Sequence, residues 1–268
     1  MIITYNDIKL KLSLADRYHQ SLVKFKVKRL LSRFIPKYKK QLEENQIVLS
    51  TVISELKGIE NPVFIDVGCN IGAVSLPVAK RMPSCQVYSI DAHPVALSGF
   101  VKNQTINRLK NVKVIGAAIS SSQSIAKIFT EPKNSGGNRL SGFEGRTDID
   151  FSQVVDEIFV PSLTMNAVFK NFEINKCDVL KIDVEGYEIE VLKSFDDESL
   201  SPKRIPVVIC EYGPEGLRSA GYTGWDMVQL MNDHGYKNCV DLKTKKPIMN
   251  ESDIPKLGNF EVTDFKFF

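Results

Sequence analysis

Four acidic residues of this chain stand at the ends of short apolar runs, an arrangement that can bind a ligand and move a proton. They are Asp66, Asp91, Asp183 and Glu211. If the apolar runs are parallel strands, their carboxyl ends meet at one edge of a sheet, where open α/β folds bind ligands. Carboxylates at that edge can accept hydrogen bonds from a ligand's hydroxyl or ammonium groups. They can also act as general bases.

A glycine loop follows the first of these runs. Residues 63–72 read VFIDVGCNIG, a strand-like run and a loop, after which apolar residues recur at helical spacing. This pattern is typical of a nucleotide cradle, in which Gly68 and Gly72 let the backbone approach the ligand. A dinucleotide fingerprint requires G-x-G-x-x-G, but Asn70 and Ala73 occupy its second and third glycine positions. The loop therefore predicts a Rossmann-like site and argues against its NAD form.

The acidic residues are expected to have different roles in ligand binding and proton transfer. Asp66 can order the loop amides or accept from a ligand's ammonium group. Asp91 follows Gly68 by 23 residues, close to the separation at which an acidic residue binds a ribose diol. Asp183 and Glu185 share one face if their strand continues, so they are the candidate general bases, with Glu211 behind them.

Each candidate also has a plainer interpretation. Glu185 can order the turn that follows it or cap the next helix, and His93, attractive as a base, is favoured as a turn residue. Cys69 is favoured as a small loop residue over a nucleophile, since no histidine is near it in sequence. A metal site made of Asp183, Glu185 and Glu211 is kept as an alternative, although no metal is predicted.

The elements that must position these residues alternate between strand and helix from residue 63 onward. Strands are predicted over 63–67, 86–90, 112–117, 124–130, 178–182, 205–210, 236–241 and 260–267. Helices are predicted over 73–81, 94–107, 163–171, 188–195 and 225–234. Such alternation predicts a mostly parallel sheet with helices on both faces.

Two regions do not follow this alternation. Residues 131–161 are expected to be irregular, with a glycine-rich stretch that can close over a substrate. Residues 1–60 are predicted to be a basic helical extension of a domain that covers 61–268. Within it, the basic segment 21–40 packs on the core, holds an anionic acceptor, or lies on an anionic membrane surface.

Composition sets further limits. A net charge of +3 over 268 residues, with little aromatic interleaving of basic residues, argues against nucleic acid binding. No apolar run reaches membrane-spanning length and no secretory signal is expected, so a cytoplasmic location, peripheral to the membrane at most, is predicted. Five widely spaced cysteines without a C-x-x-C pair indicate reduced thiols.

Three blocks of the sequence resemble the FkbM-type family of S-adenosylmethionine-dependent methyltransferases. They are residues 64–72, 87–94 and, as the sharpest match, 178–188, DVLKIDVEGYE. Residues 134–137 also resemble the family's glycine-rich insert, and the similarity spans about residues 60–240. It implies a Rossmann-like seven-stranded sheet in the order 3-2-1-4-5-7-6 with the last strand antiparallel. Asp91 departs from the family, which more often has glutamate there.

The resemblance also implies roles for individual residues. S-adenosylmethionine would be the cofactor, with Gly68, Cys69, Asn70 and Gly72 along its methionine portion. Asp91 and the adjoining Ala92 would hold the ribose, and Ala117 and Ala118 would flank the adenine. Asp183 would face the sulfonium and the acceptor.

These observations together favour an O-methyltransferase that acts on a hydroxyl of a sugar, glycan or related small metabolite. A nicotinamide-dependent oxidoreductase and a non-catalytic protein that keeps the methyltransferase fold are the alternatives. The acceptor, the oligomeric state and the role of residues 1–60 are left open.

Overall fold

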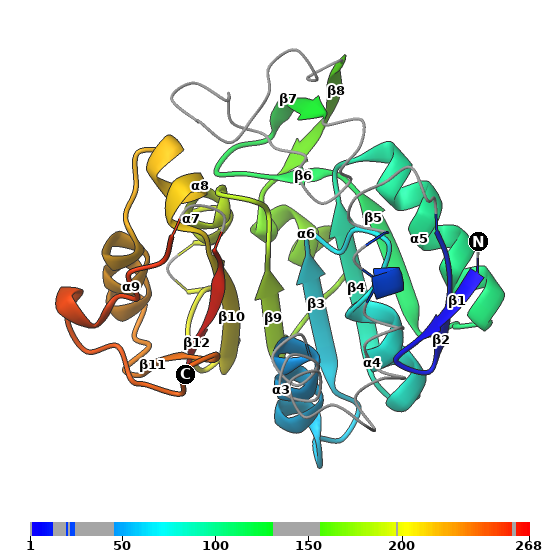
Figure 1. Cartoon of the computed structure of the whole chain (residues 1–268), viewed down its shortest axis with the longest axis horizontal. Coiled ribbons are helices and arrows are strands. Elements are labelled where there is room, and N and C mark those ends of the chain that lie inside the picture. Colours follow the sequence, from blue (N-terminus) through cyan, green and yellow to red (C-terminus); the bar gives the residue numbers. More distant parts are fainter. Residues whose placement is uncertain are drawn as a thin grey trace.

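The computed structural model describes residues 2–12, 20, 22–24, 46–130, 156–196, 198–258 and 261–268. Its centre is one seven-stranded sheet (Figure 1). The strands are β3 (Val63–Val67), β4 (Gln86–Asp91), β5 (Val112–Gly116), β9 (Val179–Ile182), β10 (Val207–Tyr212), β11 (Cys239–Asp241) and β12 (Thr263–Phe267).

The order across this sheet is β11-β12-β10-β9-β3-β4-β5. The pairs from β5 through β4, β3 and β9 to β10 are parallel, whereas β12 is antiparallel to β10 and to β11. When only these strands are numbered along the chain, the order from the β5 edge is 3-2-1-4-5-7-6. The predicted fold class is therefore confirmed.

Helices cover both faces, because strands of a parallel sheet are apolar on both sides and need two layers of cover. Residues of β3 divide accordingly, with Ile65 in one core cluster and Phe64 in the other. The Ile65 cluster includes α6 (Met165–Asn171), α7 (Glu188–Leu192) and α9 (Gly224–Asp233). The Phe64 cluster includes α3 (Ile47–Leu56), α4 (Ser75–Arg81) and α5 (Pro94–Asn107). Two further helical pieces that the structure describes are α8 (Pro214–Ser219) and the 3₁₀ turn η2 (Glu251–Asp253).

A second, three-stranded sheet lies beside the carboxyl end of the first. It consists of β6 (Ala118–Ile119), β8 (Asp156–Leu163) and β7 (Ser124–Thr130), in the order β6-β8-β7. The expectation that 131–161 is irregular is wrong for β8, and residues 131–155 lie outside the described residues. The polar and proline positions of β8 hid its alternation, because Pro161 and Phe159 face outward while Val160 packs inward.

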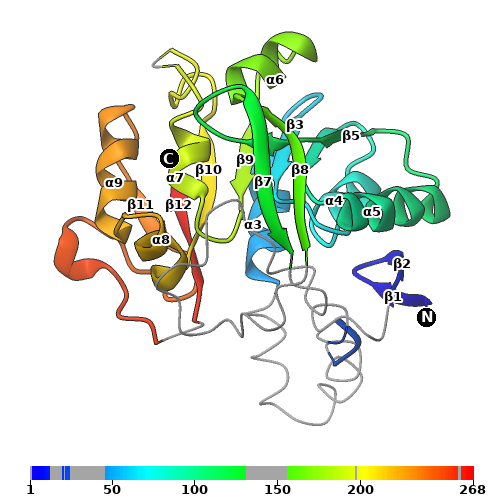
Figure 2. The same cartoon turned by 90° about the horizontal axis from the view of Figure 1, so that it is seen from above.

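The N-terminus also differs from the expectation. Residues 2–11 form a hairpin of β1 (Ile2–Tyr5) and β2 (Ile8–Lys11), not a helix (Figures 1 and 2). Buried residues alternate with exposed ones there, which is the period of a strand. Apart from residues 22–24, the basic segment 21–40 lies outside the described residues, and the division of the chain at residue 60 stays a prediction.

Among the helices that the structure describes, none combines the length and the apolarity needed to cross a bilayer. All five cysteines are described, and each is buried and free of a disulfide, as predicted.

Candidate functional site

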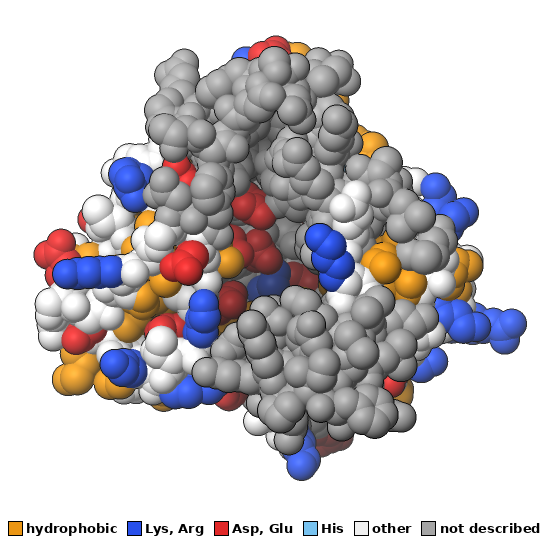
Figure 3. Space-filling model, viewed as in Figure 1, with side chains coloured by type: hydrophobic (Ala, Val, Ile, Leu, Met, Phe, Trp, Pro, Cys, Tyr) orange, Lys and Arg blue, Asp and Glu red, His pale blue; other side chains and the backbone are white. Residues whose placement is uncertain are grey.

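A cavity of about 230 Å³ opens at the carboxyl ends of the central strands. In Figure 3, the face of the molecule that is turned to the viewer has a hollow, and acidic side chains gather at its bottom. The structure brings nearly every predicted site residue to its wall, and only Gly72 does not line it. The predicted residues on the wall are Asp66, Gly68, Cys69, Asn70, Asp91, Ala92, Ala117, Ala118, Asp183, Glu185 and Glu211.

The glycine loop is held by the end of β4. The amides of Gly68 and Cys69 donate to the carbonyl of Ile90 at 2.9 and 3.1 Å, and the amide of Asn70 donates to Asp91 Oδ2 at 2.8 Å. Asn70 has a positive φ of 47°, a conformation that asparagine tolerates better than most residues. An asparagine at this position therefore fits the turn and is not a flawed dinucleotide motif.

Asp91 ties the loop to the next turn. Its Oδ1 accepts from the His93 amide at 2.8 Å, so each carboxylate oxygen has one backbone donor and capacity for another. Burial raises the pKa of Asp91 to about 6, against the lowering effect of the two amides. The free capacity is what a ribose diol would use.

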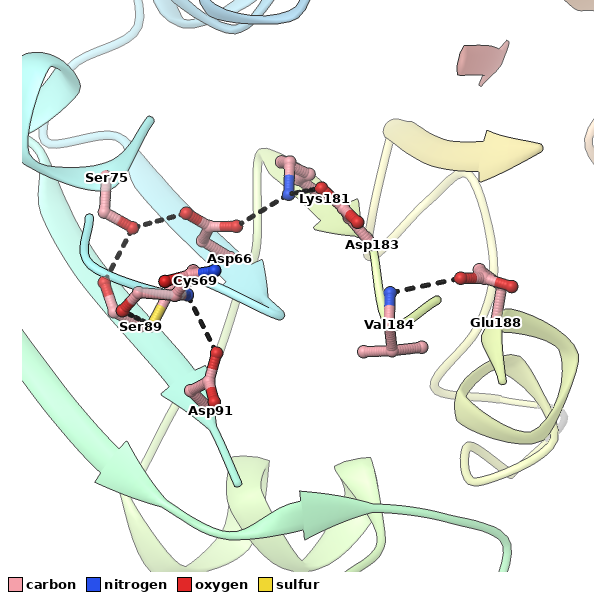
Figure 4. Close-up of polar contacts among 10 residues, drawn as sticks. Asp66, Cys69, Ser75, Ser89, Asp91, Lys181, Asp183, Val184 and Glu188 are labelled. Carbon is pink, nitrogen blue, oxygen red and sulfur yellow. Dashed lines mark hydrogen bonds and ion pairs between the residues drawn. The ribbon is translucent and has the colours of Figure 1, made fainter. Parts of the chain in front are cut away.

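Asp66 contacts side chains of the core, and its expected contact with a ligand's ammonium group stays a prediction. It is 1% exposed, and its oxygens accept from Ser75 Oγ at 2.5 Å and Lys181 Nζ at 3.3 Å (Figure 4). Ser89 Oγ in turn donates to Ser75 Oγ at 2.8 Å. Asp66 is thus the buried partner of a lysine, and the loop amides are ordered from β4.

Lys181 is a site residue that sequence reasoning missed. Its ammonium lies 3.0 Å from Asp183 Oδ2 as well as beside Asp66, and its side chain is almost fully buried. These two carboxylates raise the pKa of Lys181 well above its usual value despite the opposing effect of burial. The available signal was a lysine inside an apolar strand, since lysine is rarely buried unless it is paired.

The three candidate bases form one cluster. Carboxylate oxygens of Asp183, Glu185 and Glu211 all lie within 4.8 Å of one another. Burial, then the charges of Asp183 and Glu185, raise the pKa of Glu211 well above its usual range, which favours its protonated form. Three oxygen donors also suit a hard cation. The Lys181 ammonium would compete with such a cation at Asp183.

Glu188 is the second residue that was missed. Its Oε1 accepts from the amides of Gly186 at 2.9 Å and Val184 at 3.1 Å. It therefore orders the turn that was the alternative role for Glu185. Glu185 itself sits in that turn at a positive φ of 59° and lines the cavity.

The minor candidates follow their plainer interpretations. Burial raises the pKa of the Cys69 thiol well above its usual value, which disfavours the thiolate that a nucleophile needs. His93 caps α5 by accepting from the Ala96 amide at 3.4 Å, although it also lines the cavity.

Because burial raises the pKa values of two acidic residues, we expect the ligand-free protein to lose stability as the pH rises. Burial raises the pKa of Glu188 and of Asp264 to about 7. A carboxyl with a raised pKa stabilises the fold fully below its unfolded value near 4, and this contribution is lost as the pH rises through about 7. We expect the melting temperature to fall by several degrees between pH 5 and pH 8. The fall should be smaller for Glu188→Gln, which keeps the acceptor for both amides, and an equal fall in both proteins would contradict this assignment.

Comparison with known proteins gives one family and several relatives. The family profile described as "Methyltransferase FkbM domain" matches residues 66–237. "Methyltransferase sdnD" of Sordaria araneosa is 27% identical over 198 residues, which are 66% of this chain and 74% of that protein. "Methyltransferase 1" of Beauveria bassiana is 20% identical over 151 residues, which are 52% of this chain and 60% of that protein. A crystal structure of a SAM-dependent methyltransferase from Aquifex aeolicus, 17% identical, covers 87% of this chain and 97% of that one with a TM-score of 0.42.

Proposed function

Because the chain belongs to the FkbM methyltransferase family, whose methyl donor is S-adenosylmethionine, we propose that it is an O-methyltransferase for a hydroxyl of a sugar, glycan or related small metabolite. The observation that carries this proposal is the graded chemistry of the cavity wall. Across the sheet, the wall changes from apolar near β5 to acidic near β9 and β10.

The cavity wall fits the donor part by part. Ala117 and Ala118, directly after β5, offer apolar surface for the adenine. Asp91, at the end of β4, has acceptor capacity for the ribose hydroxyls. The loop after β3, in which Gly68 has a φ of 82°, lines the part of the cavity proposed for the methionine portion. Asp183, at the end of β9, supplies negative charge for the sulfonium.

The bound donor would supply a methyl carbon activated by positive sulfur: an O–C bond forms, the C–S bond breaks, and its electron pair stays on sulfur. The chain must then position the acceptor and take its proton. In this proposal Asp183 takes that proton. Before the transfer, the Lys181 ammonium, 3.0 Å from Asp183 Oδ2, balances the negative charge of the Asp183 carboxylate. Glu211, whose raised pKa favours the protonated form, would donate a hydrogen bond to a second oxygen of the acceptor.

A polyhydroxylated acceptor suits this cluster because neighbouring carboxylate and carboxyl groups can accept from and donate to adjacent hydroxyls. Family membership removes the nicotinamide-dependent oxidoreductase as an alternative. The non-catalytic protein is an outcome that the experiment must separate.

The test uses S-adenosylmethionine with a ¹³C-labelled methyl group and three sets of acceptors: neutral sugars, amino sugars and sugar phosphates. We expect an O-methyl carbon signal with neutral or phosphorylated sugars, and a preference for phosphates would favour the alternative in which residues 21–40 hold an anionic acceptor. Transfer to nitrogen alone would contradict the proposed O-methylation. Donor binding without transfer to any acceptor would favour the non-catalytic alternative.

A further inference from the structure

A buried asparagine on α5 connects the glycine loop to the N-terminal hairpin. Asn103 is fully buried, and both ends of its side-chain amide are used. Its Nδ2 donates to the carbonyl of Ile71, in the glycine loop, at 3.1 Å. Its Oδ1 accepts from the amide of Lys11, in β2, at 2.7 Å. Rotation of the amide by half a turn would lose both bonds, so each contact fixes the geometry of the other.

Asn107, one turn further along α5, contacts the same strand but not the loop. Its Oδ1 accepts from the Lys9 amide at 2.8 Å, and its Nδ2 donates to the Lys9 carbonyl at 2.7 Å. The two asparagine side chains thereby take the place of a neighbouring strand along the edge of β2. They differ in two respects: of the two, only Asn103 also holds the glycine loop, and Asn103 is fully buried whereas Asn107 is partly exposed.

The hairpin packs where the loop is anchored. Ile8 and Leu10 are fully buried in the same core cluster as Ile71 of the loop. Ile71 also lies close to α5, since a Cβ added at Gly99 would come within 3.0 Å of its side chain. At the turn of the hairpin, Asp7 pairs with Arg81 at the end of α4 at 2.9 Å. The hairpin thus contacts both helices that flank the loop.

We propose that Asn103 is a positioning residue that couples docking of the N-terminal hairpin to binding of the methyl donor. A docked hairpin holds Oδ1 of Asn103, which directs Nδ2 to Ile71 and fixes the loop in the shape that the donor meets. Because coupling between two sites is reciprocal, donor binding must also stabilise the hairpin. This proposal depends on the donor site and not on the identity of the acceptor.

The first test compares two alanine variants one turn apart. Asn103→Ala should weaken S-adenosylhomocysteine binding, measured by calorimetry, by about fivefold to tenfold, the range expected for a lost buried hydrogen bond. Asn107→Ala, which also loses bonds to the hairpin, should change that affinity by less than about twofold. With saturating donor, kcat of Asn103→Ala should stay near the wild-type value while the KM for the donor rises. Equal losses of affinity in both variants would overturn the proposal.

The second test measures amide hydrogen exchange over residues 2–11 with and without S-adenosylhomocysteine. We expect the ligand to slow exchange of the hairpin in the wild type and in Asn107→Ala, and not in Asn103→Ala. A merely structural Asn103 would change the basal exchange of the hairpin without changing its response to ligand. If Asn103→Ala does not fold, hydrogen exchange of the wild type alone still tests the proposal. A wild-type hairpin whose exchange is unchanged by S-adenosylhomocysteine overturns it.

Discussion

Asp183→Asn is expected to lower kcat by about 10²- to 10⁴-fold, the usual contribution of a general base, while S-adenosylhomocysteine affinity changes by less than about threefold. The amide keeps the size of the side chain but cannot take the acceptor's proton. Methyl transfer followed by mass spectrometry and binding followed by calorimetry give the two quantities. Equal losses of turnover and affinity would make Asp183 a binding residue instead.

Asp264→Asn is the matched control for that experiment. Asp264 pairs in register with Glu211 across β10 and β12, and its pKa is raised by burial and then by the charge of Asp183. It belongs to the same electrostatic neighbourhood but does not line the cavity. We expect its kcat to stay within about fivefold of the wild type. A loss as large as that of Asp183→Asn would mean that the overall charge of the cluster matters, and not one base.

Gly68→Ala is expected to destabilise the protein by more than about 4 kcal/mol or to prevent folding, which is exceptional for one methyl group. Gly68 has a φ of 82°, and an added Cβ would lie 1.7 Å from the carbonyl oxygen of Asp183. Neither atom belongs to a flexible side chain, so the β3 loop and the end of β9 would have to separate. That movement would displace Asp183 from the cavity.

Gly58→Ala separates the steric clash from the backbone strain. Gly58 has a φ of 85°, almost the same as Gly68, and nothing lies within 4 Å of an added Cβ. It should cost only about 1–2 kcal/mol, the penalty for a left-handed residue. Chemical denaturation of the two variants measures the difference, and similar losses would show that the contact between the loop and Asp183 is not tight.

The sequence predicted the parts of the site that follow from strand ends. Asp66, Asp91, Asp183 and Glu211 end or nearly end four strands that are parallel neighbours, so their convergence follows from topology alone. The order of the strands came from the family resemblance, because periodicity does not determine which strands pair.

Contacts between distant segments could not be predicted in the same way. The role of Asp66 depends on Lys181, which is more than a hundred residues away in sequence. Asn103 reads in sequence as one polar residue in a weakly amphipathic helix, and only the packed hairpin shows that both ends of its amide are used. Glu188 was expected only as the start of a helix, whereas its carboxylate reaches back to two amides.

In our proposal, the cavity at the carboxyl ends of the strands holds the methyl donor with Asp91 on its ribose. Calorimetric titration of S-adenosylhomocysteine and of NADH into the wild type, Asp91→Ala and Asp233→Ala tests this arrangement. Asp233 is an exposed residue of α9, away from the cavity wall. We predict micromolar or tighter binding of S-adenosylhomocysteine, no binding of NADH, a loss of about 1–3 kcal/mol for Asp91→Ala, and no change for Asp233→Ala. Binding of NADH without S-adenosylhomocysteine, or an unchanged affinity in Asp91→Ala, would contradict it.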